Sequence, residues 1–340
     1  MQFKEQICDI YKHLCDDESK RIFANRLLYS LTNDKTYIYE IIRNTMLYKD
    51  VDQLLNKAIG KKYIVSAGYW GKNIIDLFSD YKFEGILDNN KTGSYKGIDI
   101  FSLQQIMERY NNESFYISSP NFNQEFKGML IDAGINEEKI VDISGVMLEW
   151  YHTKQYFDLP QLSKEEEEVF ADCGCFDGEN SVMFSKWANK DNFRIYAFEP
   201  DSSNLKKCID IFSSQGIEKY ELINKGVWSE DTNLCFEANA NEGSKLSDKG
   251  EIVIPVTSID SAIEGKVTFI KMDIEGSEYE ALIGAKNHIE KYKPKLAISI
   301  YHKPEDIWEI PNLILSFNSN YKFYLRHYSL SSEETVLYAI

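Results

Sequence analysis

The chain of 340 residues carries a formal charge of −16 at neutral pH, and 43% of its residues are apolar. This length predicts more than one globular unit. The acidic charge, without clustered Lys and Arg, argues against a protein that binds nucleic acid.

Neither a secretory leader nor an uncharged apolar stretch of membrane-spanning length is visible, so we expect a cytoplasmic protein. The six cysteines show no C-x-x-C spacing and are expected to be reduced thiols. Cys173 and Cys175 could form half of a metal site, but no second pair completes a tetrahedral set of ligands.

Apolar side chains recur at helical spacing through residues 1–60, which predicts a helical segment without catalytic groups. Residues 61–145 alternate between strand and helix patterns and predict a smaller, Rossmann-like α/β domain. Residues 146–168 are expected to be a linker whose aromatic side chains pack near a cofactor. Residues 169–340 predict a second, larger α/β domain.

The smaller domain contains a turn with two glycines, Gly68 and Gly71, and Asp88 follows its second strand. These residues fit a nucleotide or nucleotide-sugar site, or a turn in a module used for packing or for assembly into a homo-oligomer. Bulky Tyr69 and Trp70 between the glycines favour the second interpretation.

The larger domain begins with a strand that leads into a loop of small residues. Asp172 ends the strand, and the loop residues Gly174, Asp177 and Gly178 let the backbone come close to a ligand. The D-x-G-x-x-x-G spacing is wider than the G-x-G-x-x-G of dinucleotide sites and leaves room for an amino-acid tail. It therefore favours S-adenosyl-L-methionine over NAD.

Polar residues follow the next strands of this domain. Glu199 comes after the strand 193–198 and is placed to accept hydrogen bonds from both ribose hydroxyls of the cofactor. Asn224 follows the strand 220–223 and is expected to contact adenine or ribose. Two alternating segments, 232–238 and 251–256, predict a β-hairpin inserted into the sheet order.

The candidate reaction centre comes from the last third of the chain. Asp273 follows the strand 267–271 and His302 follows the strand 296–300, so both are expected at strand ends that face the cofactor. Either could act as the base for a hydroxyl acceptor. Segments 322–326 and 335–339 predict a late antiparallel pair, which is typical of methyltransferases and not of NAD-binding folds.

Asp273, Glu275 and Glu278 also suggest a divalent-metal site, because hard cations bind clustered carboxylate oxygens. Alternatively, Glu278 stabilises the N-terminus of the following helix while Asp273 contacts cofactor or acceptor. Because no second acidic pair follows closely, the sequence favours a site without a metal.

The chain from about residue 169 to residue 340 resembles the FkbM family of S-adenosylmethionine-dependent methyltransferases. The resemblance rests on five segments, at Asp172 to Gly178, Phe198 to Pro200, Asn224 to Gly226, Lys271 to Glu278 and Ala281 to Ala285. It implies a class I methyltransferase fold, a doubly wound sheet with late antiparallel strands. It also implies O-methylation of a small molecule or a glycan.

Two other functions remain compatible with the sequence. The late antiparallel strands argue against an NAD(P)-dependent oxidoreductase. A non-catalytic nucleotide-binding or assembly protein stays open because Ser299 stands where many members of the family have Glu, so the acceptor site differs from theirs.

Overall fold

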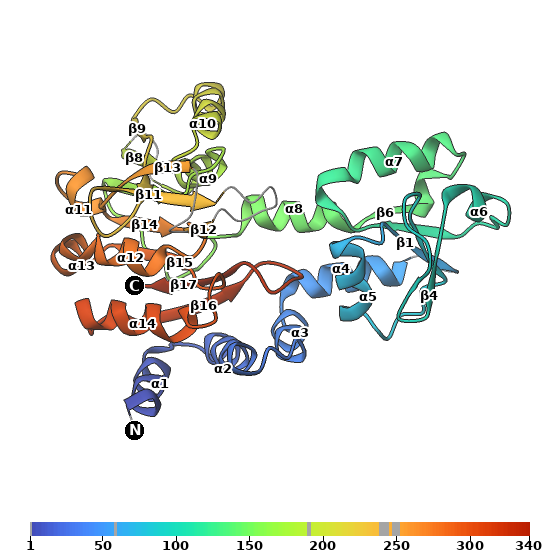
Figure 1. Ribbon diagram of the computed structural model, residues 1–340, viewed down its shortest axis with the longest axis horizontal. Helices are drawn as coiled ribbons and strands as arrows, with labels where there is room; N and C mark the ends of the chain where they lie inside the picture. The colour runs from blue at the N-terminus through green and yellow to red at the C-terminus, as the bar shows by residue number, and fades with distance from the viewer. Residues whose placement is uncertain (1, 58–59, 189–191, 238–244, 247–251) are drawn as a thin grey trace. The chain divides into compact units, whose positions relative to one another are not determined.

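The chain folds into two compact units in the computed structural model, which describes residues 2–57, 60–188, 192–237, 245–246 and 252–340 (Figure 1). The larger unit takes in the chain as far as Tyr37, together with His152–His327 and Glu333–Ile340. The smaller unit takes in Ile38–Tyr151 and Tyr328–Ser332. The division at Tyr37 falls inside the helical segment that the sequence predicts.

A seven-stranded sheet forms the centre of the larger unit. Its strands are β7 (Glu168–Cys173), β8 (Phe193–Phe198), β9 (Tyr220–Ile223), β14 (Phe269–Met272), β15 (Lys295–Ser299), β16 (Phe323–His327) and β17 (Thr335–Ala339). They lie in the order β16-β17-β15-β14-β7-β8-β9, in which β17 is antiparallel to both β15 and β16 and the strands from β15 to β9 are parallel to one another. This arrangement confirms the predicted class I methyltransferase fold with its late antiparallel strands.

The connections of this sheet contain six helices and a second, four-stranded sheet. The helices are α9 (Glu179–Trp187), α10 (Ser202–Gln215), α11 (Ile259–Ala262), α12 (Glu278–Ile283), α13 (Lys286–Tyr292) and α14 (Asp306–Phe317). The second sheet consists of β10 (Gly226–Val227), β11 (Thr232–Glu237), β12 (Lys245–Leu246) and β13 (Ile252–Thr257). β11 and β13 pair antiparallel as predicted, but they belong to this second sheet together with β12 and not to the seven-stranded sheet. The predicted end residues Ala238 and Glu251 lie outside the described residues.

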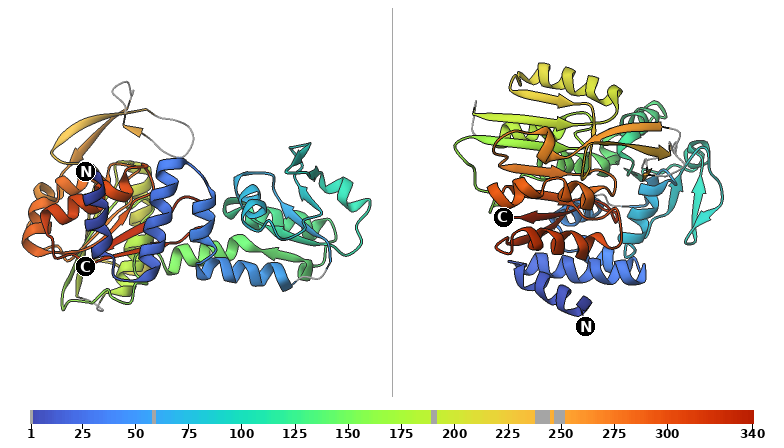
Figure 2. Two further views of the ribbon diagram at one scale, coloured as in Figure 1. Left: turned by 90° about the horizontal axis from the view of Figure 1, so that it is seen from below. Right: turned by 60° about the vertical axis from the view of Figure 1, so that its left-hand side comes forward.

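The helices α1 (Gln2–His13) and α2 (Asp17–Thr32) lie beside β16 and α14 in the larger unit (Figure 2). The backbone N–H of Cys15 donates to the Phe323 carbonyl at 3.0 Å, and the N–H of Leu325 donates to Ser19 Oγ at 2.9 Å. An exposed edge strand can pair with other chains. The segment that contains α1 and α2 covers the edge of β16.

The smaller unit has a six-stranded sheet in which only β3 is antiparallel to its neighbour. In spatial order, its strands are β3 (Ser94–Tyr95), β4 (Ile98–Phe101), β2 (Gly85–Leu87), β1 (Lys62–Val65), β5 (Ser114–Ile117) and β6 (Ile140–Asp142). Its helices are α3 (Thr36–Ile42), α4 (Met46–Lys57), α5 (Tyr69–Leu77), α6 (Leu103–Met107), α7 (Asn123–Asp132) and α8 (Ile143–Thr153), with 3₁₀ turns η1 (Pro120–Phe122) and η2 (Glu137–Lys139). The first part of the predicted linker thus belongs to α8.

All six cysteines are free thiols. Within the described residues, the helices are too short or too polar to cross a membrane.

A buried ion pair joins β7 to β14 at the centre of the larger sheet. Lys271 stands opposite Asp172 in the register, and its Nζ lies 3.2 Å from Asp172 Oδ1, with both side chains fully buried. Nζ also donates to the carbonyl of Gly174 at 2.7 Å. Burial alone would lower the pKa of Lys271, but the carboxylates of Asp172 and Asp273 raise it above its ordinary value.

We expect Lys271→Met to lower the free energy of unfolding of the larger unit by about 3 to 5 kcal/mol, because Asp172 would remain buried without a partner. The exposed pair of Arg194 with Glu221 provides the control, since Arg194→Met is expected to cost at most about 1 kcal/mol. Urea unfolding followed by circular dichroism measures both variants. An equal decrease in the free energy of unfolding of both variants would contradict the importance of the buried pair.

Candidate functional site

The strand order of the larger sheet reverses between β7 and β14, which is where open α/β sheets bind ligands, beyond the carboxyl ends of the strands. The predicted site residues follow these strand ends. The loop 174–178 follows β7, Glu199 follows β8, Asn224 follows β9, Asp273 follows β14 and His302 comes shortly after β15.

The loop after β7 needs glycine at two positions. Gly174 has φ of 78°, and a Cβ there would lie 2.1 Å from the carbonyl oxygen of Asp273. Gly178 has φ of 90° at the N-cap of α9, and its Cβ would lie 2.9 Å from the ring of Phe212. Asp177 accepts the backbone N–H of Glu179 at 3.2 Å. The loop therefore passes close to β14 before it enters the helix.

Asp172 lies behind this loop. Its side chain is fully buried, accepts a hydrogen bond from Ser181 Oγ at 2.7 Å and pairs with Lys271. Since Lys271 in turn binds the Gly174 carbonyl, Asp172 acts on the loop through its neighbours.

Glu199 connects the loop to the end of β8. Its Oε2 accepts the backbone N–H of Phe176 at 3.2 Å, and its Oε1 accepts that of Asp201 at 2.9 Å. Burial raises the pKa of Glu199 above its ordinary value. Asn224 donates from Nδ2 to the carbonyls of Glu199 and Pro200, at 3.0 and 2.9 Å, so its amide stabilises this turn.

Two tyrosine hydroxyls donate to Asp273. Tyr156 reaches Oδ2 at 2.9 Å and Tyr301 reaches Oδ1 at 3.1 Å. The hydroxyl of Tyr156 also lies 3.4 Å from Ser299 Oγ. Sequence reasoning placed Tyr156 only in the aromatic linker, because no local pattern connects it with a residue more than a hundred positions later.

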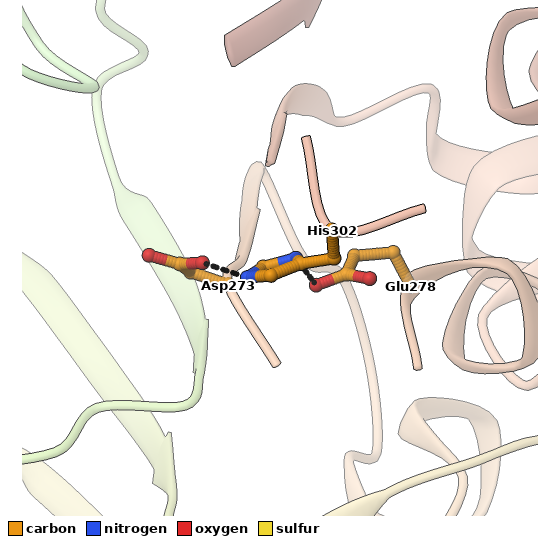
Figure 3. A group of neighbouring side chains, drawn as sticks. All are labelled: Asp273, Glu278 and His302. Carbon is orange, nitrogen blue, oxygen red and sulfur yellow. Dashed lines mark ion pairs between the residues drawn. The ribbon is translucent and has the colours of Figure 1, made fainter. Parts of the chain in front are cut away.

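The imidazole of His302 lies between carboxylates (Figure 3). Nδ1 is 3.0 Å from Glu278 Oε1, and Nε2 is 3.5 Å from Asp273 Oδ1 and 3.7 Å from Glu275 Oε2. Burial works to lower the pKa of His302, but Glu278, followed by Asp273 and Glu275, raises it to about 9. With a pKa of about 9, the imidazole is protonated at neutral pH and cannot accept a further proton.

Glu334, just before β17, is a further acid at this end of the sheet that sequence reasoning missed. Its Oε2 accepts a hydrogen bond from Gln155 at 2.5 Å, and its Oε1 accepts one from the Tyr301 hydroxyl at 3.4 Å. Burial raises the pKa of Glu334 to about 8. The carboxyl is therefore mainly protonated at neutral pH.

The glycine turn of the smaller unit is held by Asp88. Its Oδ2 accepts the backbone N–H of Ala67 at 2.9 Å, and its Oδ1 accepts those of Asn90 and Lys91 at 2.9 and 3.1 Å. A Cβ on Gly71 would lie 2.0 Å from the Ser66 carbonyl oxygen, whereas Gly68 caps α5 with an ordinary backbone. The hydrogen bonds of Asp88 therefore stabilise the backbone of the turn.

Comparison with known proteins shows similarity to methyltransferases. Residues 172–325 match the family described as the methyltransferase FkbM domain. The hexuronic acid methyltransferase AglP of Haloferax volcanii is 28% identical over 133 residues, which make up 37% of this chain and 53% of AglP. The match thus spans about half the length of that relative.

A crystal structure of a methyltransferase FkbM from Methylobacillus flagellatus KT is similar over a larger part of the chain. It covers 86% of this chain and 93% of its own, with a TM-score of 0.52 and 20% sequence identity. At that identity the likeness shows the fold alone.

The raised pKa of Glu334 makes stability depend on pH. Because the folded-state pKa of about 8 exceeds the ordinary value of 4.5, its contribution is fully present below about pH 4.5 and is lost as the pH rises through 8. We expect the melting temperature of the unsubstituted protein to fall over this range relative to Glu334→Gln, which stays neutral. Thermal unfolding at several pH values measures the difference.

The exposed Glu290 of α13 serves as the control, because Glu290→Gln is expected to keep the pH profile of the unsubstituted protein. Profiles of Glu334→Gln and the unsubstituted protein that run parallel would contradict the raised pKa.

Proposed function

We propose that this chain, whose residues 172–325 match the methyltransferase FkbM domain, transfers the methyl group of S-adenosylmethionine to a hydroxyl of a sugar acceptor. One observation supports this most directly. The glycine loop after β7 and the acids after β8 and β14 converge at the point where the sheet order reverses. The antiparallel β17 argues against an NAD(P)-dependent oxidoreductase.

On the cofactor side, we assign ribose binding to Glu199. Its Oε2 accepts one backbone N–H and keeps a lone pair for a ribose hydroxyl. Its Oε1 accepts the N–H of Asp201 and, at 3.4 Å, Nδ2 of Asn204, so a second ribose hydroxyl would replace the long contact with Asn204. Gly174, Asp177 and Gly178 shape the adjoining loop, while Asp172 and Asn224 support this side through hydrogen bonds to neighbouring groups.

On the acceptor side, we assign Asp273 and His302. The acceptor oxygen forms a bond to the methyl carbon while the carbon–sulfur bond breaks, its electron pair stays on sulfur, and the hydroxyl proton leaves. Such a displacement depends mainly on in-line alignment. With His302 already protonated at neutral pH, Asp273 is the group of the two that can take the proton.

The acceptor we propose is a hexuronic acid or a related sugar. AglP, whose name gives a hexuronic acid as its acceptor, is similar to this chain over 133 residues. For the smaller unit we propose packing or assembly, because bulky Tyr69 and Trp70 stand between the two glycines of its turn and the carboxylate of Asp88 accepts three backbone N–H groups there.

Gly174→Ala tests the cofactor site. We expect it to abolish binding of S-adenosylhomocysteine, because the new Cβ would collide with the Asp273 carbonyl oxygen. Gly216 has the same sign of φ but open space around its Cβ, so Gly216→Ala is expected to bind normally with about 1 kcal/mol less stability. Titration calorimetry measures both. Normal binding by Gly174→Ala would remove the loop from the cofactor site.

Asp273→Asn tests the acceptor side. Turnover on a glucuronic acid acceptor is expected to fall by about 100-fold, with nearly unchanged S-adenosylhomocysteine affinity, because only proton removal is lost. Glu290, an exposed acid of α13, provides the control variant Glu290→Gln with normal turnover. Release of S-adenosylhomocysteine measures the rate. Cofactor binding without turnover on any sugar acceptor, in the unsubstituted protein, would favour the non-catalytic function.

A further inference from the structure

The surroundings of His302 differ from those of the other histidine paired with an acid in the larger unit. His288 has Nδ1 at 2.6 Å from Asp260 Oδ1 and Nε2 at 3.1 Å from the Gly265 carbonyl oxygen, so both ring nitrogens have hydrogen-bonding partners. The side chain of His302 is only 9% exposed, and its Nδ1 pairs with Glu278 Oε1 at 3.0 Å, but its Nε2 makes no hydrogen bond. A buried ring nitrogen without a hydrogen bond calls for another partner.

The groups that face His302 are metal-ligand types. One ligand atom from each of Asp273, Glu278 and His302 lies within 4.8 Å of the other two. Nε2 faces the carboxylates of Asp273 and Glu275, at 3.5 and 3.7 Å, whereas Nδ1 faces Glu278. Separations of this size are close to those between two ligands that share one ion with bonds of about 2.1 Å.

The carboxylates on the two sides of the His302 ring also differ in solvent exposure. Glu278 is fully buried, and its Oε1 accepts the backbone N–H of Ile274 at 2.8 Å, which fixes the carboxylate beside Nδ1. Asp273 and Glu275 on the Nε2 side are 18% and 62% exposed. Metal-bound histidines commonly have this arrangement, in which a carboxylate holds one ring nitrogen and the other binds the ion.

We propose that a divalent first-row transition-metal ion binds between Nε2 of His302 and the carboxylates of Asp273 and Glu275, with Glu278 orienting the ring through Nδ1. One imidazole nitrogen with two carboxylates suits ions such as Mn²⁺. This assignment differs from the metal-free site that the sequence favours. The sequence shows the acids of the Lys271 to Glu278 segment, but the meeting with His302 depends on the fold.

The role of the ion in the reaction rests on the proposed function. A hexuronic acid is anionic, and three carboxylates around His302 would repel it. A bound cation would attract the acceptor, and an acceptor oxygen on the ion loses its proton more readily. Because the ion would hold the Asp273 carboxylate as a ligand, the hydroxyl proton would pass to solvent instead of to Asp273, while the oxygen attacks the methyl carbon and the carbon–sulfur bond breaks.

Titration of the chelator-treated full-length protein with MnCl₂, with free Mn²⁺ followed by electron paramagnetic resonance, tests the site. We expect one site with a micromolar dissociation constant. His302→Gln and Asp273→Asn should weaken it by about 10- to 100-fold, and Glu278→Gln by about tenfold. The matched control is His288→Gln, which should bind Mn²⁺ normally because both nitrogens of His288 already have partners.

Absence of saturable binding below millimolar Mn²⁺ in the unsubstituted protein, or equal affinity in His302→Gln, would overturn the metal site. S-adenosylhomocysteine affinity of each variant shows whether it is folded. Methyl transfer that continues at full rate in chelator would remove the ion from the reaction and leave the proposed function intact. Mn²⁺ binding without methyl transfer to any sugar would leave the site intact and contradict the proposed function.

Discussion

The ion pair between Lys271 and Asp172 is the interaction on which the cofactor side of this protein depends. It lies at the reversal of the sheet order, where β7 and β14 are neighbours, and burial excludes water from both charges. Two buried charges are costly to desolvate, and their attraction offsets this cost only in good geometry with further hydrogen bonds. In this protein Ser181 and the Gly174 carbonyl provide those bonds. The path of the glycine loop is thereby fixed by the sheet itself.

Much of this side could be predicted from local patterns. Each core strand is an apolar run that ends in a polar or small residue, and the carboxyl ends of parallel strands share one edge of a sheet. The positions of Gly174, Glu199 and Asp273 follow from that rule alone. The burial of the Asp172 side chain does not follow from that rule. It comes from the pairing with Lys271, which lies on a neighbouring strand far away in the sequence. The short strands β3 and β4 were not predicted because two to four residues carry too little periodicity.

The acceptor side could be predicted only in part, for a physical reason. Its members come from separate segments: Gln155 and Tyr156 lie before β7, Glu278 begins α12, and Glu334 precedes β17. Glu278 belongs to an acidic segment that the sequence shows, but Gln155, Tyr156 and Glu334 have no local signature, since each matters through the groups that it meets after folding. The pKa of His302 is the clearest case. The isolated side chain titrates near 6.5, and only the convergence of three carboxylates raises its pKa to about 9.

The cofactor and the acceptor oxygen are stabilised by opposite charges. The sulfonium of the cofactor is a cation, and the carboxylates around His302 favour it before transfer. As the methyl group leaves, the positive charge on sulfur disappears and this attraction is lost, so the carboxylates alone stabilise the starting state more than the products. A cation bound beside Asp273 reverses that balance, because it favours the negative charge that develops on the acceptor oxygen. An acidic reaction centre in a chain of charge −16 is therefore better suited to catalysis when it holds a metal ion than when it is empty.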